Sequence, residues 1–288
     1  MPFYVYAWIT SITYALYAIV AKLIGKYLIK NPWQFSFFSI LFTGIVTSIM
    51  ALYFGATVPS QWGFIFLAAF FIALGSASYL FALKHLDVSI MAPLFNVRVV
   101  ITVLMGWLFL GEVLTGRSIG LVLLVVGAGF FATMDEKLSL KSFFGKSVKL
   151  GLLFMLILSI QSIFVNRAID QTDYWTALLW MGIFSVGFGF AMLYSKFKND
   201  LKRTDPKKYL GVALLSVLGG LGDLSAYKAY ESNVGISSVI ISLPISMVLA
   251  FLFSVFKPEL LEKHPSKVYA VRFGAAAIMI WGALQLSK

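Results

Sequence analysis

Two ionisable side chains stand inside stretches of sequence that are otherwise suited to hydrocarbon. Asp223 lies in LGGLGDLSAYKAY, residues 218–230, and Arg98 lies in an apolar run that begins near residue 88. A charged side chain at the centre of a membrane helix costs about 2.5–3.5 kcal/mol on insertion scales. The guanidinium fork of Arg98 can bind a carboxylate or a phosphate, and the carboxylate of Asp223 can bind an ammonium group. The two residues therefore predict a binding site for a polar solute.

The same two residues have a second interpretation, which is a buried Arg98–Asp223 ion pair that holds the protein together without touching a ligand. We favour the binding site, because ionisable groups inside membrane helices usually face the interior of the bundle or a water-filled cavity. Asn96 lies two residues from Arg98, about 200° around a helix, so the two side chains cannot share one narrow cavity. We expect Arg98 to face the cavity and Asn96 to bond a neighbouring helix.

Aromatic and amide side chains near these charges extend the candidate site. Tyr227 lies four residues after Asp223 and shares its helical face. Tyr14 and Tyr17 share a face of the first apolar segment and could stack on an organic solute or a cation, although plain helix packing explains them too. Gln161 is an amide in the middle of an apolar segment, where it could bind a ligand or bond a neighbouring helix.

The elements that carry these residues are membrane helices. Of the 288 residues, 60% are hydrophobic and only 12% are charged, well below the roughly 25% usual in soluble domains. The first segment lacks the basic start of a secretory signal and reads as a membrane helix. We expect an all-α, polytopic membrane protein with ten transmembrane helices, near residues 4–24, 33–54, 62–83, 88–110, 117–133, 148–168, 174–195, 209–230, 235–256 and 268–286.

The distribution of basic residues predicts how these helices are oriented. Of the 23 lysines and arginines, 17 lie in or beside the odd-numbered links between helices. Because basic links stay in the cytoplasm, the odd-numbered links are expected there and both termini outside. The net charge of +11 then reflects contact with anionic lipid headgroups. We expect no nucleic-acid partner.

Common catalytic and metal-binding motifs are absent from this sequence. It contains no cysteine, and its two histidines, His85 and His264, are far apart. Walker A, HExxH and GxSxG motifs are absent as well. We therefore expect no catalytic residues, no metal, no cofactor and no enzymatic activity.

An internal repeat divides the chain into two units of five helices. When Glu112 is set against Glu259, the helices that precede them align, and both carboxylates close the fourth helix of their unit, where we expect a packing or conformational role. The first unit covers residues 1–133, a cytoplasmic linker covers 134–147, and the second unit covers 148–288. An odd number of helices forces the second unit to run inverted in the membrane, with a solute site near the midplane where the units meet.

The two units differ at the candidate site. In the first unit the segment GSASYLFA places Ser76 opposite Asp223, with Tyr79 one turn further on. The acid therefore occurs in one unit alone. This asymmetry is expected where a symmetric scaffold binds an asymmetric molecule, and it adds Tyr79 to the candidate residues.

The end of the first unit resembles a known family. The segment LFLGEVLTGRSIGLVLLVVGAGFF is similar to the signature of the EamA-type drug/metabolite transporters, in which an apolar helix ends in Leu-Gly-Glu before a glycine-rich final helix. The second unit has a degenerate form, VFKPELLEKHPSKVYAVRFGAAAIMIWG, with Pro258 where Gly111 stands in the first. The resemblance implies ten helices around a central cavity that move small organic solutes by alternating access.

We therefore predict a secondary transporter for a small polar or amphipathic metabolite. An amino acid, with an aromatic one as a favoured case, suits a cavity with one fixed cation, one fixed anion and several tyrosines, and export is the more frequent direction in the family. Two alternatives are uptake or exchange of a cationic amine or alcohol, and a lipid-handling or structural membrane protein. We expect a monomer in contact with membrane lipids, in the inner membrane of a prokaryote.

Overall fold

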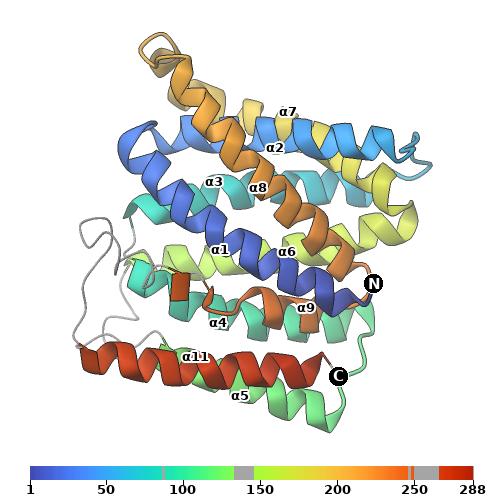
Figure 1. Ribbon diagram of the computed structural model, residues 1–288. Helices are drawn as coiled ribbons and strands as arrows, with labels where there is room; N and C mark the ends of the chain where they lie inside the picture. The colour runs from blue at the N-terminus through green and yellow to red at the C-terminus, as the bar shows by residue number, and fades with distance from the viewer. Residues whose placement is uncertain (86–87, 133–145, 246–247, 250–265, 288) are drawn as a thin grey trace.

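The computed structural model describes residues 1–85, 88–132, 146–245, 248–249 and 266–287, and these residues form helices without any strand (Figure 1). In chain order the helices are α1 (Phe3–Tyr27), α2 (Pro32–Tyr53), α3 (Gly63–His85), α4 (Val88–Met105), the π-helical turn η1 (Gly106–Leu110), α5 (Gly116–Ala132), α6 (Lys146–Gln171), α7 (Tyr174–Leu201), α8 (Lys207–Tyr230), α9 (Val234–Ile241) and α11 (Ser266–Leu286).

The starts of α2 and α7 follow from local capping chemistry. Asn31 caps α2, since its side-chain oxygen accepts a hydrogen bond from the backbone N–H of Trp33 at 2.9 Å. Asp173 caps α7 and accepts from the N–H groups of Trp175 and Thr176, each at 3.0 Å. These bonds satisfy backbone donors that have no partner within the helix.

The long loops expected from composition are shorter in the structure. The basic stretch 196–208 was expected to be a link, but α7 continues through Leu201, because KFKNDL contains no helix breaker. Similarly, α6 begins at Lys146, within the expected linker 134–147. Residues 133–145 of that linker lie outside the described residues.

The fourth helix of each expected unit departs from a continuous α-helix. The helix expected over 88–110 changes to the π-helical turn after Met105 and ends at Gly111, whose φ of +70° favours glycine. The helix expected over 235–256 stops at Ile241. Pro244 explains this break, since it lacks an N–H and disfavours helical backbone at the residue before it. Glu259, Pro258 and His264 lie outside the described residues.

Helices of the N-terminal part of the chain, α1 to α5, pack against helices of the C-terminal part, α6 to α11, throughout the bundle. The pairs α1–α8, α3–α6, α2–α7 and α5–α11 contact along their lengths, and α2–α8, α3–α7, α4–α6, α1–α9 and α4–α9 add further contacts. Both chain termini lie at the same end of the bundle (Figure 1). Helices of the first part are thus held mainly by helices of the second.

The polarity of the molecule suits a lipid environment. Side chains such as Ile49, Leu123 and Leu214 point outward, whereas Thr10 and Gln34 are buried. Among the described residues, six helices are long and apolar enough to cross a membrane, namely α1, α2, α3, α6, α7 and α8, and shorter apolar helices run over Phe95–Leu110, Gly116–Gly129 and Ala270–Leu286. The chain is an integral membrane protein.

Candidate substrate site

Glycines on α8 bring this helix close to α1 and α2. A Cβ on Gly222 would collide with the ring of Tyr14, and one on Gly219 would lie 3.2 Å from the ring of Tyr17. On the neighbouring face, Gly220 lies against Val46 of α2. Small residues allow this approach. This close packing places two tyrosines of α1 directly on α8.

Asp223 follows this glycine segment and meets one of those tyrosines. Its Oδ1 accepts a hydrogen bond of 2.5 Å from the hydroxyl of Tyr14. The two residues are 209 positions apart in sequence, so the contact joins the first helix of the chain to the eighth. A hydroxyl donor to a carboxylate makes a short, charge-assisted bond, and it holds the acid of α8 toward α1.

Two further tyrosines continue the face of α8 that carries Asp223. Tyr227 and Tyr230 lie four and seven residues after it, which places all three on one side of the helix. Tyr227 interacts with the side chain of Gln161 on α6, and the amide oxygen of Gln161 lies against Gly75 of α3. The candidate residues of α6 and α8 therefore meet.

Arg98 reaches the same face of α8 from α4. Its Nη2 donates a hydrogen bond of 3.0 Å to the hydroxyl of Tyr230, its exposed fraction is 7%, and its Nε has no hydrogen-bond partner. The ion pair with Asp223 that the sequence left open is not formed, because each charge is bonded to a different tyrosine. Asn96 diverges from Arg98 as expected and packs against Gly129 of α5.

The remaining candidates, Tyr17 and Tyr79, lie further along the bundle. Tyr79 of α3 packs against Phe154 of α6, with ring centroids 5.8 Å apart. Tyr17 of α1 lies against Gly219, one helical turn before Asp223. The structure thus distributes the seven candidates over α1, α3, α4, α6 and α8. It joins Tyr14 to Asp223 and Gln161 to Tyr227, whereas Arg98 is bonded to Tyr230, which is not one of the seven.

Five of the seven candidate side chains are partly exposed. They are Tyr14, Tyr17, Tyr79, Gln161 and Asp223. In contrast, Tyr227 and Arg98 are buried. The candidate residues therefore differ in accessibility, and Arg98 and Tyr227 are the most enclosed of them.

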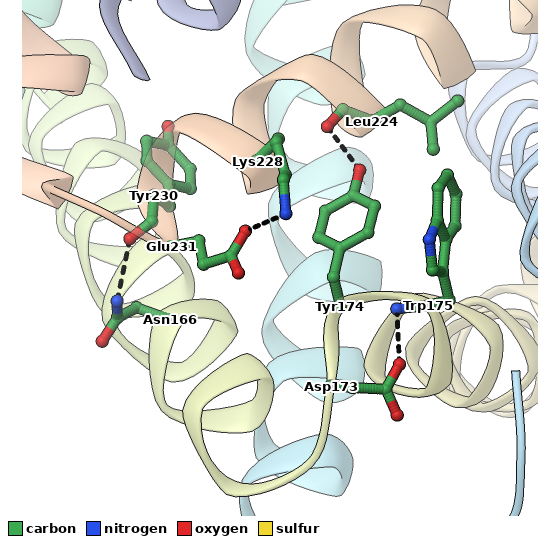
Figure 2. A network of polar contacts seen from close by, with 8 residues as sticks. All are labelled: Asn166, Asp173, Tyr174, Trp175, Leu224, Lys228, Tyr230 and Glu231. Carbon is green, nitrogen blue, oxygen red and sulfur yellow. Dashed lines mark hydrogen bonds and ion pairs between the residues drawn. The ribbon is translucent and has the colours of Figure 1, made fainter. Parts of the chain in front are cut away.

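A second polar network closes the end of α8 (Figure 2). Tyr174 donates a hydrogen bond of 2.6 Å to the carbonyl of Leu224, and Asn166 donates one of 2.8 Å to the carbonyl of Tyr230. Lys228 pairs with Glu231 at 2.5 Å and lies 4.8 Å from the ring centroid of Tyr174. This network fixes the face of α8 from α6 and α7.

Tyr230 and this network were missed by sequence reasoning. Tyr230 carries a signal that could have found it, because it continues the spacing of Asp223 and Tyr227 by one more turn. Asn166 and Tyr174 carry no such signal, since their partners are backbone carbonyls of another helix.

Asp173, which lies just before α7, has a lowered pKa. Burial tends to raise the pKa of this carboxyl, but hydrogen bonds from Thr176 and Trp175 outweigh that effect and lower the pKa below its ordinary value.

Glu112 joins the two parts of the chain at the same end. Its carboxylate accepts hydrogen bonds from the backbone N–H groups of Val234 and Gly235 in the first turn of α9. Burial raises its pKa although these two bonds oppose the shift. The packing role expected for this residue is therefore a contact between the end of η1 and the start of α9.

Within the part of the chain that the structure describes, no three His, Cys, Asp or Glu residues gather as a metal site would require.

Comparison with known proteins agrees with this architecture. One solved structure, described only as "Crystal structure of protein", shares 14% sequence identity with this chain, covers 99% of both chains and has a TM-score of 0.70. At that identity the likeness shows the fold alone. No curated protein matches.

A family model gives a more specific result. Residues 1–134 match the model of the EamA-like transporter family. This range contains the LFLGEVLTGRSIG segment, and it is consistent with the wider drug/metabolite transporter superfamily. Members of this family are membrane transporters, so the match supports transport of a small molecule across a lipid bilayer. Over residues 1–134, slightly less than half of its length, the chain is therefore similar to the EamA-like transporter family.

Proposed function

We propose that this protein is a secondary transporter that exports an amino acid, with aromatic amino acids as the favoured substrates, by alternating access. The observation that carries the proposal is the separation of Arg98 from Asp223. Each charge is bonded to a neutral tyrosine hydroxyl and not to the other. Buried charges are normally paired, so each charge can still gain from an opposite charge that a zwitterionic substrate supplies.

The unused hydrogen-bonding capacity of Arg98 supports this assignment. Its Nε is buried without a partner, and a buried unsatisfied donor costs about 1–3 kcal/mol. A substrate carboxylate would satisfy this donor together with an Nη group through the geometry of the guanidinium fork. Asp223 would take the ammonium group, and the rings of Tyr14 and Tyr227 would contact an aromatic side chain.

The helix pairings support an inverted repeat. If α1 to α5 are exchanged with α6, α7, α8, α9 and α11 in that order, the pair α1–α8 becomes α6–α3, α2–α8 becomes α7–α3, and α4–α6 becomes α9–α1, all of which are contacts in the structure. The pairs α2–α7, α4–α9 and α5–α11 map onto themselves. This exchange is what two equivalent units of opposite orientation would give.

Partial exposure of the candidate side chains supports a cavity between these units. Asp223, Tyr14, Tyr17, Tyr79 and Gln161 are each partly exposed, and they belong to four different helices. Transporters of this general kind bind solutes where the repeats meet and expose the site to each side in turn. With the odd-numbered links in the cytoplasm, both termini lie outside, and export moves the substrate toward that side.

The proposal is tested by counterflow in proteoliposomes. Vesicles loaded with unlabelled phenylalanine should accumulate labelled phenylalanine from outside, and protein-free vesicles should not. Parallel vesicles loaded with leucine and glutamate measure the preference for an aromatic side chain. The amino-acid assignment fails if none of the three labelled solutes accumulates while the protein remains folded.

A cationic amine is the second candidate, and the different exposure of the two charges favours it. Asp223 is partly exposed and has tyrosines around it, whereas Arg98 is buried. Aromatic rings around a carboxylate can bind an organic cation. Labelled choline is the test solute, and Arg98→Ala separates the candidates, because a cationic substrate has no use for the guanidinium.

A further inference from the structure

The end of the bundle formed by the α1–α2 and α7–α8 links contains two adjoining cavities. The larger one, of about 670 Å³, lies between these links, and we call it the basic pocket because Lys30, Arg203 and Lys208 line it. The smaller one, of about 260 Å³, lies between α3, α6 and α7, and we call it the apolar crevice because Leu74, Phe154 and Leu193 line it. Neither has Arg98 or Asp223 in its lining.

One pair of aromatic rings belongs to both cavities. Trp33 and Phe81 line the basic pocket and the apolar crevice, and their rings stack with centroids 5.0 Å apart and an interplanar angle of 21°. The ammonium group of Lys196 lies 4.1 Å from the ring centroid of Trp33, at the edge of the crevice. A single molecule could therefore extend from one cavity into the other across this pair.

The charges of the basic pocket favour an anion. Three cationic side chains line it against one carboxylate, that of Asp200. One oxygen of that carboxylate already accepts a hydrogen bond of 2.5 Å from the side chain of Asn31. The exposed ends of Lys30 and Arg203 can approach a phosphate from two different links, and guanidinium and ammonium groups are the side chains that bind phosphates.

The apolar crevice favours a hydrocarbon chain. Leu153, which lines it, is 54% exposed on the outer surface of α6, so the crevice opens sideways to the lipid. Its lining on α3 runs from Leu74 to Phe81, which is about 10 Å along a helix at 1.5 Å per residue. That length corresponds to about a third of a 30 Å hydrocarbon core.

We propose that the basic pocket and the apolar crevice together bind one anionic phospholipid, with its phosphate among Lys30, Arg203 and Lys208 and an acyl chain beside Trp33 and Phe81. A soluble anion would use the charges and leave the crevice empty. A zwitterionic lipid would use the crevice and gain less from the charges. This site is independent of the transport proposal, since it shares no residue with it.

Native mass spectrometry of the full-length protein in detergent tests this site. Dioleoyl phosphatidylglycerol is the probe, and dioleoyl phosphatidylcholine has the same chains without the net charge. The triple variant Lys30→Gln, Arg203→Gln, Lys208→Gln should weaken phosphatidylglycerol binding by about tenfold, because each basic residue contributes to attraction of an anionic headgroup. It should leave phosphatidylcholine binding unchanged.

The matched control removes the same charge from the same end of the protein. Lys26→Gln, Lys198→Gln and Lys207→Gln change exposed side chains that do not line the pocket, and phosphatidylglycerol binding should stay within about twofold of the original. Melting temperatures measured without lipid check that both triple variants fold. If the pocket triple variant does not fold, Arg203→Gln alone replaces it, and its phosphatidylglycerol and phosphatidylcholine binding are compared in the same way. Equal losses in both triple variants, or displacement of the lipid by glycerol phosphate, would overturn the proposal.

Discussion

Asp223 and Arg98 are opposite charges near the middle of their helices, yet their surroundings differ. Asp223 follows the glycines of α8 in sequence, is partly exposed and is bonded to Tyr14 of α1. Arg98 is buried, is bonded to Tyr230 and keeps one donor without a partner. On this difference we expect water to reach the acid more readily than the base. Under the proposed transport function, a substrate would meet Asp223 first and then complete the bonds of Arg98.

Removing the charge of Asp223 should have the largest effect. Asp223→Asn keeps the shape of the side chain but cannot pair with an ammonium group. We expect phenylalanine transport in proteoliposomes to fall by about 100-fold, since loss of one partner of a buried charge pair costs about 2–5 kcal/mol. The melting temperature of the variant is the control for folding. Transport at the original rate would show that the acid has a structural role.

Replacing Arg98 should distinguish the two candidate substrates, an amino acid and a cationic amine. Arg98→Ala removes the fork for a carboxylate, and we expect phenylalanine transport to fall at least about tenfold because a charge-assisted bond contributes 1.5–3 kcal/mol. Arg98→Lys keeps the charge without the fork and should recover part of the flux. Equal losses for phenylalanine and choline would contradict a carboxylate-binding role.

The sequence predicts where Asp223 and Arg98 lie in their helices, but it does not predict their hydrogen-bond partners. The depth of both charges and the shared face of Asp223 and Tyr227 follow from hydropathy and helical spacing. The partners do not, because Tyr14 and Asp223 lie 209 residues apart, and only packing of α1 on α8 brings them together. The sequence could equally well accommodate an Arg98–Asp223 ion pair, which the structure does not contain.

The helices were also predicted only in part. Long apolar runs predicted the helices from α1 to α8 well, whereas their ends depended on local chemistry that hydropathy does not register. Gly111 ends the π-helical turn at a positive φ, and Pro244 follows the early end of α9. The basic residues after Tyr194 suggested a link, but polar residues continue a helix readily beyond the membrane.

The close approach of α1 and α8 can be tested by adding one methyl group. A Cβ at Gly222 would lie 2.5 Å from Cε1 of Tyr14, so Gly222→Ala must displace a ring that donates to Asp223. We expect the protein to lose about 1–3 kcal/mol of stability, as overpacked positions do, measured as a lower melting temperature in detergent.

Gly187 on α7 provides the matched control for this change. No atom lies within 4 Å of a Cβ added there, and alanine is favoured over glycine within helices by about 0.5–1 kcal/mol. Gly187→Ala should therefore leave the melting temperature unchanged or raise it. Equal destabilisation by both substitutions would exclude a special role for the contact between Gly222 and Tyr14.

The two tyrosine hydroxyls should differ in their importance for stability. Tyr230→Phe leaves a further donor of buried Arg98 without a partner, and we expect a loss of about 1–3 kcal/mol. Tyr14→Phe removes the donor to Asp223, where water can take its place, so the expected loss is below about 1 kcal/mol. Denaturation in detergent compares the two variants directly. The reverse order would contradict the difference in water access.

Single-cysteine labelling tests that access most directly, because the natural sequence contains no cysteine. A charged thiol reagent that does not cross membranes should label Asp223→Cys and Gln161→Cys at least about tenfold faster than Ala226→Cys, a buried position on α8. Leu214→Cys, which is exposed on the outer surface of α8, reports reagent that arrives through lipid and should also label slowly. Labelling of Asp223→Cys as slow as that of Ala226→Cys would contradict the existence of open, water-filled space beside the acid.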